Sequence, residues 1–115
     1  MAVKNLSNGK RIVGRIIWRR SDLEKAFGLM FRRKLKDSAM IFVFDSEELQ
    51  PLHMWFVFSA IDVLFLDSSK RVVEIKKGFR PFRFYSPRAR ARYIIELPEG
   101  AIVEAGVKVG DRIGF

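Results

Sequence analysis

Three polar side chains beside strongly apolar segments could carry chemistry: Arg32, His53 and Asp62. His53 is the sole histidine of the chain, and histidine is the side chain whose ordinary pKa lies closest to neutral pH. It could bind a ligand or transfer a proton at the mouth of a pocket. The alternative is a hydrogen-bonded histidine at the end of a strand.

Asp62 follows an aromatic segment and precedes the apolar run 63–66. A carboxylate buried there needs a partner, because an unpaired buried charge is costly. It could pair with Arg32 or His53 around a ligand, or it could form a structural ion pair or cap backbone amides at a turn. Arg32 could hold a carboxylate or phosphate through two hydrogen bonds, or it could lock a helix to the sheet through an Arg–Asp pair. The sequence does not show whether the three residues meet.

A basic segment covers residues 76–92 and contains seven cations, two prolines and four aromatic residues, but no acidic residue. Cations neutralise phosphates, and exposed aromatic faces stack on unpaired bases. The segment is therefore a candidate surface for nucleic acid or another anion. The alternative is a solvated basic face whose phenylalanines point into the core. On a strand, Arg88, Arg90 and Arg92 would form one linear row. The candidate cations are Lys76, Lys77, Arg80, Arg83, Arg88, Arg90 and Arg92.

Several classes of site are excluded by composition. The chain has no cysteine, which excludes disulfides, thiolate metal sites and cysteine nucleophiles. One histidine excludes multi-histidine zinc sites. No phosphate-binding loop, dinucleotide fingerprint or Ser-His-Asp signature is present. We therefore predict no metal and no cofactor, and the sequence names no catalytic residue.

The 115 residues carry 22 Lys plus Arg against 13 Asp plus Glu, which gives a net charge of +9. With 49% apolar residues, this length predicts a single domain over residues 1–115 with its own core. No apolar run is long enough to span a membrane, and no signal peptide is apparent, which favours a cytoplasmic protein with no membrane partner. The scarcity of Asn, Gln and Cys beside 30% charged residues is typical of proteins from thermophiles.

The apolar pattern predicts short strands connected by turns. Asn8-Gly9 favours a hairpin turn, and Ser21 to Glu24 has the pattern of a capping box that starts a short helix. Asp45 to Leu52 is expected to form an acidic loop, and residues 62–76 a hairpin. The expected strands cover residues 11–18, 39–44, 53–58, 62–66, 71–76, 93–97 and 112–115. The expected fold class is therefore mainly β, an antiparallel two-sheet sandwich with one short α-helix near the N-terminus.

Five residue blocks stand in a characteristic order, and they are Gly28–Arg32, His53–Phe56, Ile61–Asp67, Ile95–Gly100 and Val109–Arg112. These blocks resemble the domain of unknown function family 192, and the resemblance covers nearly the whole chain, from about Arg15 to Phe115. The resemblance implies a compact, jelly-roll-like β-sandwich and leaves the biochemical activity open. Where many members of that family have Trp-Met-Arg-Asn-Thr, this chain has the residues 53–57, so it follows a His-Met variant.

Three functions remain open at this level. The favoured one is a non-enzymatic binding module for an anionic partner, either nucleic acid or a small phosphorylated or carboxylated molecule. The second is an accessory protein that acts by oligomerisation, although the sequence does not give the oligomeric state. The third is a hydrolase or isomerase that uses Asp62, His53 and Arg32 on a small anionic substrate.

Overall fold

The computed structural model describes residues 2–20, 35–53 and 59–115, with Leu52 and His53 defined by their backbone pairing. A five-stranded sheet lies at the centre, in the order β3 (Arg15–Arg19), β4 (Ser38–Glu48), β9 (Ala91–Pro98), β6 (Ile61–Leu66) and β7 (Val72–Phe79). A three-stranded sheet joins β10 (Ile113–Gly114), β1 (Val3–Asn5) and β2 (Arg11–Val13). A separate pair is made by β5 (Leu52–His53) and β8 (Phe84–Tyr85). The helix α2 covers Ala101–Glu104.

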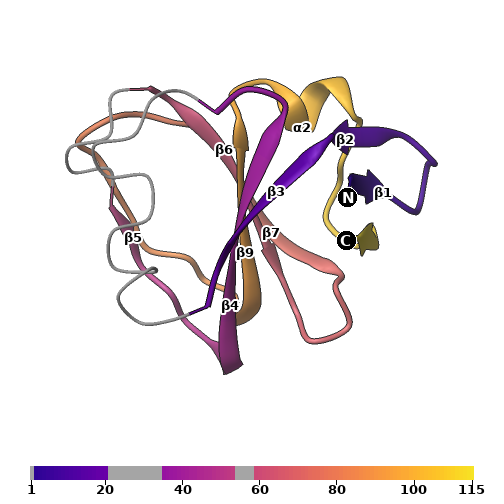
Figure 1. The fold of residues 1–115 in the computed structure, drawn as a ribbon. Coiled ribbons are helices and arrows are strands. Elements are labelled where there is room, and N and C mark those ends of the chain that lie inside the picture. Colours follow the sequence, from indigo (N-terminus) through magenta and orange to yellow (C-terminus); the bar gives the residue numbers. More distant parts are fainter. Residues whose placement is uncertain (1, 21–34, 54–58) are drawn as a thin grey trace.

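The central sheet is buried on both faces where its inner strands are apolar on both faces, as in residues 39–42 of β4 and 63–66 of β6. Along β4, Ala39 and Ile41 belong to one core cluster, whereas Met40 and Phe42 belong to the other. The first cluster packs against the three-stranded sheet and α2, which lie together on the right in Figure 1. On the opposite side, Tyr85 of β8 packs against the second cluster. Alternation along each strand thus supplies two cores from one sheet.

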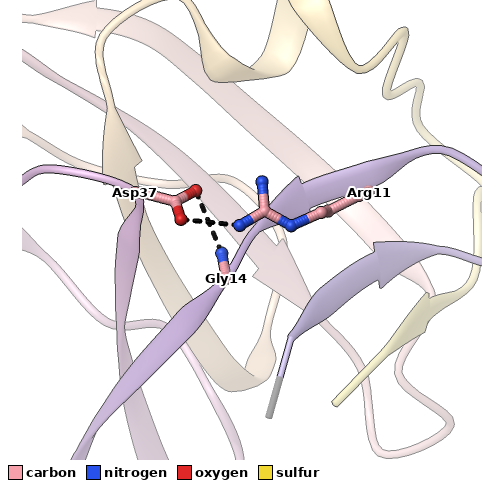
Figure 2. A network of polar contacts seen from close by, with 3 residues as sticks. All are labelled: Arg11, Gly14 and Asp37. Atoms are coloured by element: carbon pink, nitrogen blue, oxygen red, sulfur yellow. Dashed lines mark hydrogen bonds and ion pairs between the residues drawn. The ribbon is translucent and has the colours of Figure 1, made fainter.

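Gly14 is the point where the chain leaves one sheet for the other. The sequence pattern predicted a single strand over 11–18, but β2 ends at Val13 and β3 begins at Arg15. The amide of Gly14 donates to Asp37 Oδ1 at 3.1 Å, and Asp37 Oδ2 lies 2.6 Å from Arg11 Nη2 (Figure 2). A Cβ atom at position 14 would overlap this Arg11–Asp37 ion pair. A side chain at position 14 would therefore displace this exposed ion pair, whereas glycine leaves it in place.

Two further expectations differ from the structure, and a third falls outside the described residues. The strands β3 and β4 pair in parallel, so the prediction of a purely antiparallel fold is wrong at this edge. The predicted acidic loop 45–52 is wrong in its first half, because β4 continues to Glu48 and pairs with β9 there. The described helix lies near the C-terminal end, whereas the helix expected from Ser21 falls outside the described residues.

The hairpin over residues 62–76 is confirmed, since β6 and β7 pair antiparallel around a turn at Asp67 to Lys70. The turn at Asn8-Gly9 is also confirmed: β1 and β2 pair antiparallel around it, and Gly9 has a φ of 76°. The mainly β class is thus established, while the jelly-roll arrangement stays a prediction. In the part of the chain that the structure describes, no helix is both long and apolar enough to cross a bilayer.

Candidate functional site

Asp62 lies in β6 with only 2% of its surface exposed, and both of its carboxylate oxygens accept hydrogen bonds from backbone amides. Oδ1 accepts from Gly78 at 2.9 Å, and Oδ2 accepts from Gly100 at 3.0 Å and from Ile102 at 3.1 Å. Gly78 and Gly100 have φ angles of 59° and 90°, which turn their amides toward the carboxylate. These bonds match the interpretation of Asp62 as a cap for backbone amides, and they tie β6 to the end of β7 and to the start of α2.

The other two members of the predicted pocket are not brought to Asp62 by the described residues. Arg32 falls outside the residues that the structure describes. His53 is placed by its backbone alone, in β5, where it pairs with Phe84 of β8. The shared site of Arg32, His53 and Asp62 therefore stays a prediction.

The basic segment separates into engaged and exposed cations. Lys76 Nζ lies 5.4 Å from the centre of the Tyr85 ring. Arg92 lies over the Tyr93 ring, and its Nε donates to the carbonyl oxygen of Phe44. The remaining five cations are exposed, and none forms an ion pair within the described ranges 2–20, 35–53 and 59–115. They are Lys77, Arg80, Arg83, Arg88 and Arg90, and we call them the basic surface.

The prediction that Arg88, Arg90 and Arg92 share one face of a strand is wrong. The strand β9 begins at Ala91, so only Arg92 lies within it. Arg88 and Arg90 belong to the irregular stretch between β8 and β9, which runs down the left side of the molecule in Figure 1. The other cations of the basic surface lie earlier in the chain: Lys77 belongs to β7, and Arg80 and Arg83 lie between β7 and β8.

An acidic residue from a neighbouring strand orders this connecting segment. Glu74 of β7 accepts the backbone amides of Arg88 and Ala89, each at 2.8 Å, and it also accepts the hydroxyl of Tyr85. Burial, together with the hydrogen bond and charge of Glu74, raises the pKa of Tyr85 to about 12. The hydroxyl therefore stays protonated at neutral pH and keeps donating to Glu74. Glu74 lies two residues before the basic segment, so the composition of that segment gives no sign of this acidic partner.

Glu96 is a second acidic residue with an unusual environment that was not predicted from the sequence. It lies in β9 between Met40 of β4 and Val63 of β6, and it is 8% exposed. Its Oε1 has no hydrogen-bond partner among the residues that the structure describes. Burial raises the pKa of Glu96 to about 8, so the side chain is mostly protonated at neutral pH. A charged residue inside the otherwise apolar strand 93–97 was the available signal.

A pocket of about 270 Å³ opens between β2 and α2. Its charged lining consists of Arg11, Asp37, Glu99 and Glu104. The hydrogen bond from Arg11 lowers the pKa of Asp37, so this carboxylate remains charged. With three carboxylates against one guanidinium, the pocket does not suit an anionic ligand. The basic surface therefore remains the better place for an anion.

Comparison with known proteins identifies the family. The DUF192 family (Uncharacterized ACR, COG1430) matches residues 3–115. The chain belongs to the DUF192 family. This confirms the resemblance seen in the residue blocks, which covered residues 15–115.

Relatives of this DUF192 chain occur in thermophilic archaea. A UPF0127 protein of Thermococcus sibiricus is 39% identical over 113 residues, which cover 96% of this chain and 72% of the relative. A UPF0127 protein of Pyrococcus furiosus is 35% identical and covers 95% of this chain and 93% of the relative. Among solved structures, a protein of unknown function from Novosphingobium aromaticivorans is 26% identical, with a TM-score of 0.87. That match covers 99% of this chain and 82% of the other.

Proposed function

We propose that this protein is a non-enzymatic binding module that holds an anionic partner on the basic surface. The partner is a nucleic acid or a small phosphorylated or carboxylated molecule. The observation that carries the proposal is the set of five exposed cations that form no ion pair within the described residues. Unpaired surface cations attract anions at long range and exchange their counterions for phosphates on binding.

The hydrogen bonds of Glu74 support this proposal, because they hold the backbone beneath part of the basic surface in one conformation. Two amides and one hydroxyl converge on this carboxylate, and the amides belong to Arg88 and its neighbour Ala89. A segment that is ordered before binding loses less conformational entropy when the partner arrives. The cost of binding is therefore lower than for a mobile basic tail.

The bonding of Asp62 favours a binding role over catalysis at this residue. Both of its oxygens already accept backbone amides, so the carboxylate has little capacity left for a substrate. A catalytic base must reach the proton that it abstracts, and Asp62 is almost completely buried. The proposal therefore assigns no reaction step to Asp62.

Fluorescence anisotropy tests the proposal with labelled single-stranded RNA and duplex DNA, at low and at physiological salt. Five phosphate contacts predict a slope of log affinity against log salt of about −3.5 for a single strand. The triple variant R80A/R83A/R90A should weaken binding and reduce the slope by about 2. A matched control, K10A/K108A/R112A, removes the same charge from exposed positions outside the basic segment.

Comparison of the two triple variants shows whether binding depends on the position of the cations or only on net charge. If the control triple weakens binding as much as R80A/R83A/R90A, net charge alone drives the association and the proposal is wrong. Absence of binding at physiological salt to both nucleic acids, and to a phosphorylated polyanion such as polyphosphate, would also overturn it.

A further inference from the structure

The aromatic residues within the basic segment divide into two that anchor it and two that project from it. Phe79 is 1% exposed, and its ring lies 6.2 Å from that of Tyr85. By contrast, Phe82 is 48% exposed and Phe84 is 62% exposed. The expectation that the phenylalanines point into the core is therefore correct for Phe79 and wrong for Phe82 and Phe84.

The alternation of β8 explains why Phe84 projects outward. Tyr85 points inward, where its ring lies 5.8 Å from Phe65 and its hydroxyl donates to Glu74. Neighbouring residues of a strand point to opposite faces, so Phe84 must point away from the core. The buried anchor thus fixes the direction of the exposed ring.

Phe82 occupies an unusual backbone conformation. Its φ is 59°, and it follows Pro81 in a turn, which is the arrangement of a type II turn. Glycine or asparagine is the usual residue at that position, because a bulky side chain is strained there. Strained residues of this kind cluster at sites that bind ligands. The turn presents a large aromatic ring where a glycine would be more stable.

Each exposed ring has an exposed guanidinium next to it in sequence. Arg83 lies between Phe82 and Phe84, and Arg80 precedes the turn at Pro81. Guanidinium groups bind phosphates, and phenylalanine rings stack on bases that are not paired. A duplex hides the faces of its bases, and a lipid surface calls for a contiguous apolar patch, which the two arginines interrupt. The alternation of ring and cation matches the alternation of base and phosphate in a single strand.

We propose that the anionic partner is a single-stranded nucleic acid, whose unpaired bases stack on Phe84 and Phe82 while Arg80 and Arg83 contact its phosphates. This inference rests on the proposed function, since it needs the basic surface to hold an anion. It adds that recognition depends on bases as well as on charge. Phe84 contributes more to stacking than Phe82 does, because its ring is the more exposed of the two.

Anisotropy titrations at physiological salt test the inference with two labelled probes: a single-stranded oligonucleotide and inorganic polyphosphate, which has the charge but no bases. The variant F84A should weaken oligonucleotide binding on the order of 10-fold and leave polyphosphate binding unchanged. F84W should retain oligonucleotide binding, and its added tryptophan emission should be quenched by the stacked base. V109A, which truncates an exposed apolar side chain outside the basic segment, is the matched control.

The outcomes separate this inference from the proposed function. If both probes bind but F84A and F82A/F84A leave the oligonucleotide affinity unchanged, stacking is refuted while anion binding stands. If neither probe binds, the proposed function fails as well. Tighter binding to vesicles containing anionic lipid than to the oligonucleotide would assign the exposed rings to a membrane and overturn the inference. If F84A weakens both probes equally and also lowers the melting temperature, Phe84 has a structural role and the inference is wrong.

Discussion

Replacing Glu96 by glutamine should remove a steep pH dependence from the stability of the protein. The folded state keeps the Glu96 proton up to a pKa of about 8, whereas an ordinary glutamate releases it near 4.5. Between these two values, unfolding releases a proton, so raising the pH favours the unfolded state. The stabilising contribution is complete below the lower value and is lost as the pH rises through the higher one.

The size of this pH dependence follows from the difference between the pKa of Glu96 in the folded state and the ordinary pKa of a glutamate. Each pH unit inside this window changes the free energy of unfolding by about 1.4 kcal/mol, so the loss between pH 6 and pH 8 is roughly 2 kcal/mol. Glutamine has nearly the same shape as the protonated glutamate and does not titrate. Relative to the native protein, E96Q should therefore gain roughly 2 kcal/mol across the same interval.

Urea unfolding followed by tryptophan fluorescence measures this difference at several pH values. The free energy of unfolding of both proteins is needed at each pH, because other groups also titrate and cancel only in the difference. A difference between E96Q and the native protein that stays constant from pH 6 to pH 9 would refute the assignment of a buried, protonated Glu96.

Three other substitutions test the contacts described above. D62N should lower the free energy of unfolding by about 2–3 kcal/mol, because an amide group has only one oxygen and cannot replace both carboxylate oxygens as acceptors. Chemical denaturation measures this loss, with the exposed substitution D45N as the control. E74Q should lower the pKa of Tyr85 from about 12 toward its ordinary value, because the negative charge beside the hydroxyl is removed; ultraviolet absorbance during alkaline titration reports this change. F82G should raise the stability by about 1 kcal/mol, since glycine adopts a φ of 59° without strain; a lower urea midpoint would contradict the strained conformation.

Local sequence patterns predicted the elements whose structure is decided locally. The turn at Asn8-Gly9 depends on a residue that adopts positive φ easily, and Gly9 has that conformation. The buried strands 39–44 and 62–66 are apolar on both faces, which is visible in the sequence and holds in β4 and β6. In these elements, the residues themselves determine both the conformation and the burial.

Elements that depend on distant partners were not predictable in the same way. Gly14 lies within the single strand predicted over 11–18, but the ion pair between Arg11 and Asp37 occupies the space beside it, and the chain changes sheets there. The parallel pairing of β3 with β4 depends on how the intervening segment returns, which no local pattern encodes. The helix α2 has four residues, too few for a helical period to appear in the sequence.

The candidate site shows the same division. The sequence predicted the basic segment, but not which of its aromatic side chains are buried. Their directions depend on where the strand β8 begins and on the turn before it, in which Phe82 has a positive φ. It could not find Glu74, because the acceptor of the Arg88 amide comes from β7, 14 residues earlier in the chain. A buried polar group whose partner comes from another strand becomes visible only once the strands are assembled.

The pairing of β1 with β10 has a consequence for the order of folding. Lys4 lies opposite Gly114, so this pairing joins residues from the two ends of the described chain. Closing so long a loop costs more entropy than forming the β6–β7 hairpin, whose strands are separated by a short turn. We expect the β6–β7 hairpin to be formed in the folding transition state and the β1–β10 pairing to follow it. Substitutions at Ile113 should then accelerate unfolding and barely change the folding rate in stopped-flow measurements, whereas equal changes in both rates would place this closure in the folding nucleus.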